Sequence, residues 1–126
     1  MNRLSLIFFS AYILNFIWEN LHSHLYDSYR GEKITQKILI RASLFDAVFI
    51  TVMSIFFVEL SYLKIRLWYS LVFGFVIAVL IENHALKKNR WKYNKFMPII
   101  PIIKSGLTPT IQLGLISYLI YTIALN

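Results

Sequence analysis

The chain has 126 residues, of which 58% are hydrophobic and 15% charged, and its formal net charge is +7. This composition excludes an ordinary water-soluble domain and favours a membrane protein. The absence of cysteine excludes disulfides, thiolate metal sites and cysteine nucleophiles. The cations flank apolar stretches, where they favour anionic lipid head groups, so nucleic acid is not an expected partner.

Four windows of the sequence are apolar enough to cross a bilayer, which takes about 20 residues. They cover residues 4–25, 42–62, 67–86 and 107–125. The first window has no small-x-small cleavage site, so we interpret it as a retained helix and not a signal peptide. The sequence therefore predicts an all-α integral membrane protein, with residues 1–126 forming one up-and-down bundle of four transmembrane helices.

The connection between the third and fourth windows contains RWKYNKFMPIIPII, from Arg90 to Ile103. Its first half alternates rings with cations, which is typical of a segment at the level of the lipid head groups. Its second half is too short and proline-broken to span, but apolar enough to dip back into the membrane. We therefore predict an amphipathic or re-entrant segment between helices three and four.

Positive charges divide unequally between the two ends of the predicted bundle. The first and third connections hold ten Lys and Arg, against three in the termini and the second connection. The ten cations are Arg30, Lys33, Lys37, Arg41, Lys87, Lys88, Arg90, Lys92, Lys95 and Lys104. The positive-inside rule predicts a multi-pass protein of the cell membrane, with these two connections cytoplasmic and both termini outside.

Polar residues of the first window recur at helical spacing and form one stripe. They are Tyr12, Asn15, Glu19, His22 and Tyr26. Turning a carboxylate towards hydrocarbon costs about 2.5 to 3.5 kcal/mol even on lenient insertion scales. We therefore expect this stripe to face protein or water.

The other three windows place polar residues at the same depth as this stripe. Asp46 lies near the start of the second window, Glu82 near the end of the third and Gln112 near the start of the fourth. Gly74 shares a helix face with Glu82, so a neighbouring backbone can approach closely there. Gln112 and Ser117 lie on opposite faces of the fourth window, and the sequence leaves open which face packs inward.

These residues predict a polar pocket on the cytoplasmic side, and the candidate catalytic residues are Glu19, Glu82, His22 and Asp46. Two buried carboxylates with separated pKa values can give and take a proton, and a histidine can relay it. The candidate substrate-binding residues are Tyr12, Asn15, Tyr26, Arg90, Trp91, Tyr93 and Gln112. No cofactor is implied.

Two other interpretations of these residues stay open. Glu19 and Glu82 could form salt bridges with Lys87 or Arg90 and only fasten the helix ends. Glu19 and His22 also form Glu-x-x-His, a metal-binding spacing in helix bundles, although a single copy does not predict a metal. A mononuclear site that adds Asp46 and Glu82 is the weaker alternative.

The predicted function is a small membrane-embedded acid–base enzyme, or a binding protein of the same design, for a lipid- or isoprenoid-like molecule. Expected partners are membrane lipids and such a small molecule, and a homo-oligomer is compatible with the sequence. One alternative is a transporter or channel subunit that uses the acids for ion or proton coupling. The other is a membrane scaffold or assembly protein without a ligand.

Overall fold

The computed structural model describes residues 2–59 and 66–125. It contains four helices that are long and apolar enough to cross a membrane, which confirms the predicted windows at this level. They are α1 (Arg3–His22), α2 (Gln36–Ser54), α3 (Tyr69–Lys87) and α4 (Leu107–Leu125). The 3₁₀ turn η1 (Ser23–Leu25) extends α1, and the π-helical turn η2 (Ile55–Glu59) extends α2. The end of the second predicted window, residues 60–62, lies outside the described residues.

Local capping explains where the helices begin. Asn2 caps α1, where its Oδ1 accepts a hydrogen bond from the Ser5 amide at 2.8 Å. Thr35 caps α2 in the same way, so that helix begins at Gln36 and not at residue 42 as the hydropathy indicated. The early turns were missed because they are polar. Pro109 lies in the first turn of α4, where its missing N–H costs nothing.

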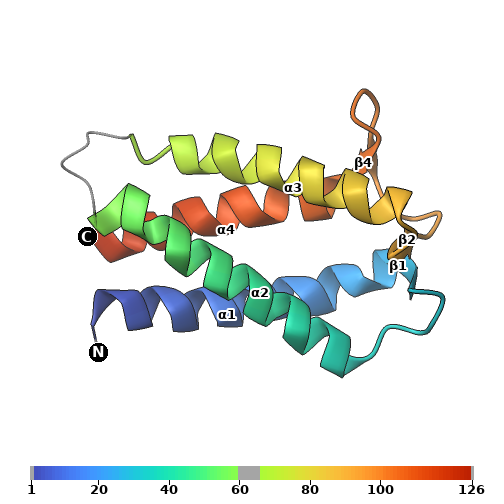
Figure 1. Cartoon of the computed structure of the whole chain (residues 1–126), viewed down its shortest axis with the longest axis horizontal. Coiled ribbons are helices and arrows are strands. Elements are labelled where there is room, and N and C mark those ends of the chain that lie inside the picture. The colour runs from blue at the N-terminus through green and yellow to red at the C-terminus, as the bar shows by residue number, and fades with distance from the viewer. Residues whose placement is uncertain (1, 60–65, 126) are drawn as a thin grey trace.

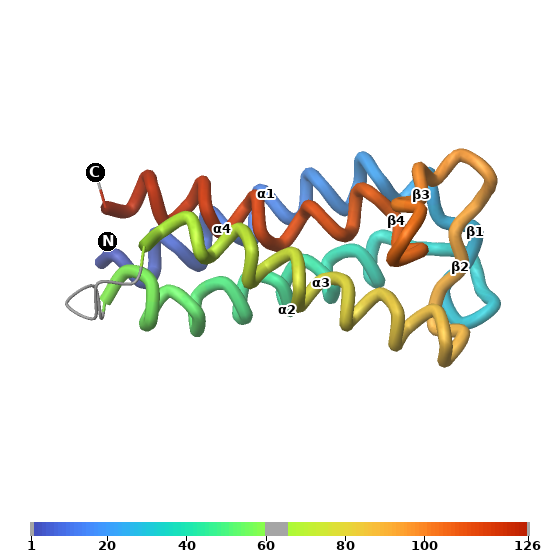
Figure 2. Tube along the Cα trace, turned by 90° about the horizontal axis from the view of Figure 1, so that it is seen from above, coloured from blue at the N-terminus to red at the C-terminus, as the bar shows by residue number. Residues whose placement is uncertain are grey.

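The helices form two layers, with α1 and α4 in one and α2 and α3 in the other (Figures 1 and 2). α4 is the central helix, because it packs against α1 and α3 and also contacts α2 and η2. α2 and α3 meet near the second connection, where the rings of Phe49 and Phe57 lie 6.4 and 6.5 Å from Phe73. Towards the other end these two helices diverge (Figure 1).

Two glycines bring α3 and α4 into backbone contact. A Cβ added to Gly74 would lie 2.3 Å from the Gly114 Cα, and one added to Gly114 would lie 2.4 Å from the Leu71 carbonyl oxygen. Gly74 shares its buried face with Ala78 and Glu82, as the sequence predicts. The small residues therefore fix how close α3 and its carboxylate come to α4.

Four short strands form in the predicted amphipathic or re-entrant segment and in the first connection. β1 (Tyr26–Tyr29) pairs antiparallel with β2 (Trp91–Tyr93), and β3 (Ile99–Ile100) pairs with β4 (Ser105–Gly106). The first pair ties the two connections together across the end of the bundle. The second forms a hairpin that projects from the bundle (Figure 1), and Ile102 beside it is 92% exposed.

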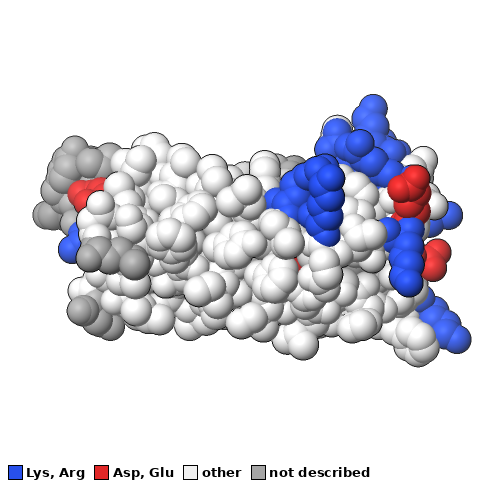
Figure 3. Space-filling model, turned by 90° about the horizontal axis from the view of Figure 1, so that it is seen from below, with Lys and Arg blue, Asp and Glu red and all other residues white. Residues whose placement is uncertain are grey.

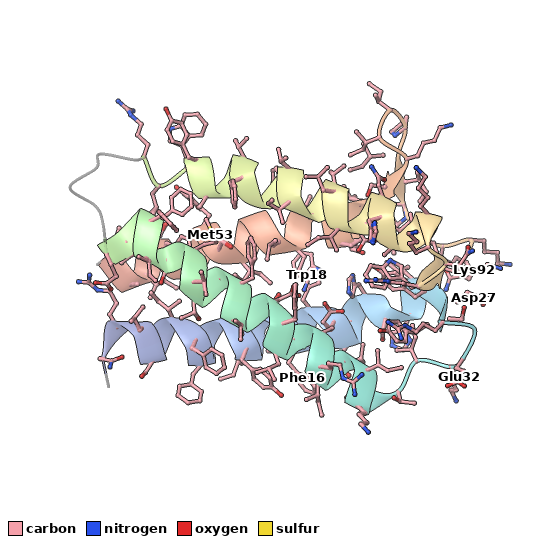
Figure 4. The ribbon with its side chains drawn as sticks, in the orientation of Figure 1. Phe16, Trp18, Asp27, Glu32, Met53 and Lys92 are labelled. Atoms are coloured by element: carbon pink, nitrogen blue, oxygen red, sulfur yellow. The ribbon has the colours of Figure 1, made fainter. Side chains whose placement is uncertain are left out.

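Charged residues gather at this strand end of the molecule. Figure 3 shows most of the visible Lys and Arg in the half of the molecule towards this end, while the other half is white except at its tip. Asp27, Glu32 and Lys92 lie beyond the helix ends (Figure 4). At the opposite end, Arg3 and Glu59 form an ion pair at 3.7 Å. α1 begins and α4 ends at that opposite end (Figure 1).

Candidate functional site

A cavity of about 350 Å³ lies at the strand end, within the range of small-molecule sites. It forms where α2 and α3 diverge, and Phe45 of α2 and Ile81 of α3 belong to its apolar lining. All four candidate catalytic residues line it, as do four of the candidate binding residues. These eight are Glu19, His22, Asp46, Glu82, Tyr26, Arg90, Trp91 and Gln112.

The side-chain amide of Gln112 joins three helices at one wall of the cavity. Its Nε2 lies 2.8 Å from Asn15 Oδ1, 3.0 Å from Glu19 Oε1 and 3.2 Å from Asp46 Oδ2. We call these four residues the Gln112 cluster. Asn15 donates its own amide to the Ala11 carbonyl oxygen at 2.7 Å, which leaves Asn15 Oδ1 as the acceptor. An amide has two N–H groups, so the three oxygens compete for two protons.

Glu19 also contacts His22, the other half of its Glu-x-x-His motif. His22 Nε2 lies 2.9 Å from Glu19 Oε2, and His22 Nδ1 lies 3.0 Å from Thr108 Oγ1. When Nε2 carries the proton and donates to the carboxylate, Nδ1 accepts from the threonine hydroxyl. Both ring nitrogens of His22 are then engaged in hydrogen bonds, one to Glu19 and one to Thr108, so neither nitrogen is free.

Glu82 is held on the opposite wall by two aromatic donors from the third connection. Its Oε2 accepts hydrogen bonds from Trp91 Nε1 at 3.0 Å and from Tyr93 Oη at 2.5 Å. Tyr93 Oη in turn accepts from the Gly106 amide at 3.0 Å. We call Glu82, Trp91 and Tyr93 the Glu82 clamp. These two side chains therefore point towards Glu82, whereas the nearby Phe96 is 68% exposed.

A helix C-cap turns the chain back so that the clamp can form. Asn89 adopts a positive φ of 57° just after α3. The Arg90 amide donates to the Ala85 carbonyl at 2.8 Å, and the Asn89 amide donates to the Leu86 carbonyl at 3.2 Å. This is the Schellman pattern of helix ends. It reverses the chain directly onto β2, whose pairing with β1 carries Trp91 and Tyr93 over Glu82.

The environment of Tyr26 and Tyr93 keeps both phenols protonated. Burial, and then the neighbouring charges of Glu82 and Tyr93, raise the pKa of Tyr26 well above its usual value. Burial, the charge of Glu82 and the hydrogen bond to it raise the pKa of Tyr93 as well. Both phenols are hydrogen-bond donors at neutral pH. Tyr26 packs edge-on against His22, with ring centroids 5.3 Å apart.

Three candidate binding residues do not line the cavity. Asn15 is fully buried in the Gln112 cluster, and Tyr93 lies behind Glu82 in the clamp. Tyr12 stacks on Phe16, with ring centroids 6.2 Å apart, and packs against the apolar core. The expected pairing of Glu19 with Glu82 is not a direct one, because each carboxylate has its own hydrogen-bond partners.

The salt bridges weighed from the sequence are not formed among the described residues. Glu82 is bonded to the clamp and Glu19 to Gln112 and His22, and neither carboxylate pairs with Lys87 or Arg90. The described residues contain no group of three or more acidic, histidine or cysteine side chains placed to hold a metal ion. Among the described residues, the three carboxylates therefore rely on Gln112, His22, Trp91 and Tyr93 as donors and not on Lys or Arg.

Sequence reasoning did not assign Arg41, Tyr29 or Thr108 to the site. Arg41 and Tyr29 line the cavity, and Thr108 binds His22. Thr108 lies four residues before Gln112, so its position on the same helix face is a usable signal. The pairing of β1 with β2 brings Tyr29 to the cavity, and the sequence has no local signal for this pairing.

Comparison of the chain with protein-family models, characterised proteins and solved structures finds no match.

Proposed function

We propose that this chain is a multi-pass membrane protein whose cavity binds an amphiphilic, lipid- or isoprenoid-like molecule and performs acid–base chemistry on it. One observation supports this above others. Three carboxylates, Glu19, Asp46 and Glu82, line one cavity together with apolar side chains between the diverging α2 and α3. A polar head group fits beside the three carboxylates, and a hydrocarbon chain fits beside the apolar side chains.

The proton-transfer groups in this proposal are the carboxylate oxygens that the protein leaves available. Glu82 Oε1 and Asp46 Oδ1 accept no hydrogen bond from an amide, indole or hydroxyl group among residues 2–59 and 66–125, and the Asp46 carboxyl lies within hydrogen-bonding reach of the Glu19 carboxyl. Each belongs to a carboxylate whose other oxygen is fixed by a neutral donor, which orients it before the ligand arrives. Glu82 and Asp46 are thus the proposed acid and base, and Glu19 with His22 forms the proposed relay.

The other half of the bundle favours a one-sided site over a transport path. Its buried serine hydroxyls bond to backbone carbonyls three or four residues earlier in the chain: Ser54 to Thr51, Ser70 to Leu67 and Ser117 to Leu113, at 2.5 to 2.7 Å. The buried Tyr121 hydroxyl of α4 donates to the Ile50 carbonyl of α2. Apolar side chains such as Ile50, Ile116 and Ile120 fill the space between them. Transport requires polar groups through the depth of the membrane.

Photolabelling tests binding in the cavity. Detergent-solubilised protein is irradiated with a long-chain alkyl alcohol that carries a diazirine, and the labelled peptides are identified by mass spectrometry. We expect labels on the α2 peptide around Phe45. Ala42→Trp fills the cavity and should reduce this labelling about tenfold or more. Val48→Trp is the control, because Val48 is 48% exposed on the same helix and lies outside the cavity.

Equal labelling of the two tryptophan variants would contradict binding in the cavity. The acid–base step is tested separately by extracting copurified amphiphiles after incubation in D₂O. Wild-type protein should introduce deuterium at carbon, whereas Glu82→Gln and Asp46→Asn should bind the same molecules without introducing it. If wild-type protein is fully occupied by a ligand that contains no deuterium, the chain is a binding protein and the proposal of an enzyme is rejected.

We also propose that the strand end of the bundle lies on the cytoplasmic side. This orientation is supported by the unequal distribution of Lys and Arg, with ten at this end and three in the remainder of the chain. In sealed vesicles, single cysteines at Lys33 and Lys92 should react with an impermeant maleimide only from the cytoplasmic side. A cysteine at Asn2, beside the start of α1, should react only from outside. Reversed labelling of all three positions would invert the proposed orientation.

A further inference from the structure

The strand end carries cations that have no acidic partner. Among the described residues, the salt bridges are Arg3 with Glu59, at the opposite end, and Glu19 with His22. The ten cations thus form no ion pair within residues 2–59 and 66–125. Only Asp27 and Glu32 are exposed acids of this end. The mouth of the cavity is therefore a positively charged surface.

Two of these cations belong to the cavity itself. Arg41 comes from the start of α2 and Arg90 from the turn after α3, and both line the cavity with exposed side chains. Arg90 also lines a second, shallower depression together with Arg30 and Lys88. The two guanidinium groups thus come from the start of α2 and from the turn that follows α3.

The charged groups are ordered by depth. Asp46 follows Arg41 by five residues on α2, which places the carboxylate about 7.5 Å further into the bundle at 1.5 Å per residue. Phe45 and Ile81 supply an apolar surface beside it. A molecule lying along this path meets cations first, then carboxylates and amide groups, and is flanked by hydrocarbon. That order matches an anionic group, a short uncharged polar segment and an apolar chain.

We infer that the ligand of this cavity is a phosphate-bearing amphiphile, with its phosphate held by Arg41 and Arg90. Guanidinium groups bind phosphate oxygens through paired, charge-assisted hydrogen bonds. Held in this way, the phosphate stays at the mouth, away from the negative charge of Asp46 and Glu82. The atoms a few bonds beyond the phosphate then lie beside these carboxylates. This inference rests on the proposed function, because it names the chemical class of the same ligand.

The test compares two photoreactive probes that differ in one group, a diazirine-bearing alkyl phosphate and the matching alkyl alcohol. Charge-assisted hydrogen bonds favour the phosphate, so it should label the α2 peptide at about tenfold lower concentration or less. Arg41→Gln/Arg90→Gln should remove this advantage. The control variant Lys37→Gln/Lys92→Gln removes the same charge from neighbouring exposed positions that do not line the cavity. This variant should still be labelled by the alkyl phosphate at lower concentration than by the alcohol.

Inorganic phosphate and pyrophosphate distinguish a lipid-borne phosphate from a free one. Neither anion should displace the photoreactive alkyl phosphate at concentrations where unlabelled alkyl phosphate does. If inorganic phosphate or pyrophosphate competes as well as unlabelled alkyl phosphate, the mouth of the cavity binds a soluble anion and the amphiphilic ligand is rejected. Equal labelling of wild-type protein by the two probes would overturn the phosphate inference while the proposed cavity function survives. Labelling by neither probe would instead overturn the proposed function. The wild-type comparison holds even if the arginine variant fails to fold.

Discussion

Replacing Gln112 by leucine is expected to lower the stability of the folded protein by about 3 kcal/mol or more. The substitution keeps a similar volume but removes the amide that lies within reach of Asn15, Glu19 and Asp46. Each buried acceptor left without a donor costs about 1 to 3 kcal/mol, and a charged one costs more. The apparent melting temperature of purified protein in detergent measures the loss.

Gln36→Leu is the matched control for this substitution. Gln36 makes one exposed hydrogen bond to Asn20 at 2.7 Å, so its loss should change stability by no more than about 0.5 kcal/mol. Adding Asp46→Asn to Gln112→Leu should recover part of the loss, because the new amide can donate to Glu19. Equal melting temperatures for the two leucine variants would show that the Gln112 cluster does not stabilise the fold.

Gly74→Ala is expected to reduce the yield of folded protein severely, although it adds only one methyl group. The new Cβ would lie 2.3 Å from the Gly114 Cα and 2.5 Å from its backbone nitrogen, so two helix backbones must separate. Overpacking by side chains alone costs about 1 to 3 kcal/mol, and backbone atoms cannot rotate away. Because Glu82 lies two turns further along α3, the clamp should move relative to Gln112.

Gly31→Ala is the corresponding control in the first connection. A Cβ at Gly31 meets no atom within 4 Å, and only its φ of +81° opposes the substitution. The expected cost is about 1 kcal/mol, through backbone strain alone. The yield of folded protein and its elution in size-exclusion chromatography measure both variants. A Gly74→Ala protein as stable as Gly31→Ala would mean that α3 and α4 pack with more space than the glycine contact indicates.

The helices were predictable because hydropathy over a whole window reports them directly. The start of α2 was not, since Lys37 and Arg41 make its first turns polar while Thr35 still caps them. Helical spacing also placed Asn15 and His22 on a buried face. These features depend on local sequence alone, which is why they could be read without the structure.

The partners of each polar group depended on how the helices pair in space. Equal depth predicted that Glu19 and Glu82 would act together, but α1 lies against α2 and α4, so Glu19 meets Gln112 instead. The hydrogen-bond partners of the rings in the third connection were unpredictable for a similar reason. Alternating rings and cations indicate a lipid interface, whereas the turn at Asn89 and the β1–β2 pairing direct Trp91 and Tyr93 towards Glu82.

Under the proposed function, the divergence of α2 and α3 determines which concentration governs ligand binding. The two helices meet at Phe49, Phe57 and Phe73 and separate towards the strand end, where Phe45 and Ile81 line the cavity, so we expect a lipid-like ligand to enter through the gap between α2 and α3 from the bilayer. A ligand that arrives through this gap has already partitioned into lipid, and its occupancy follows its mole fraction in the leaflet. Diluting the sample with buffer would then leave occupancy nearly unchanged, whereas adding empty vesicles would deplete it.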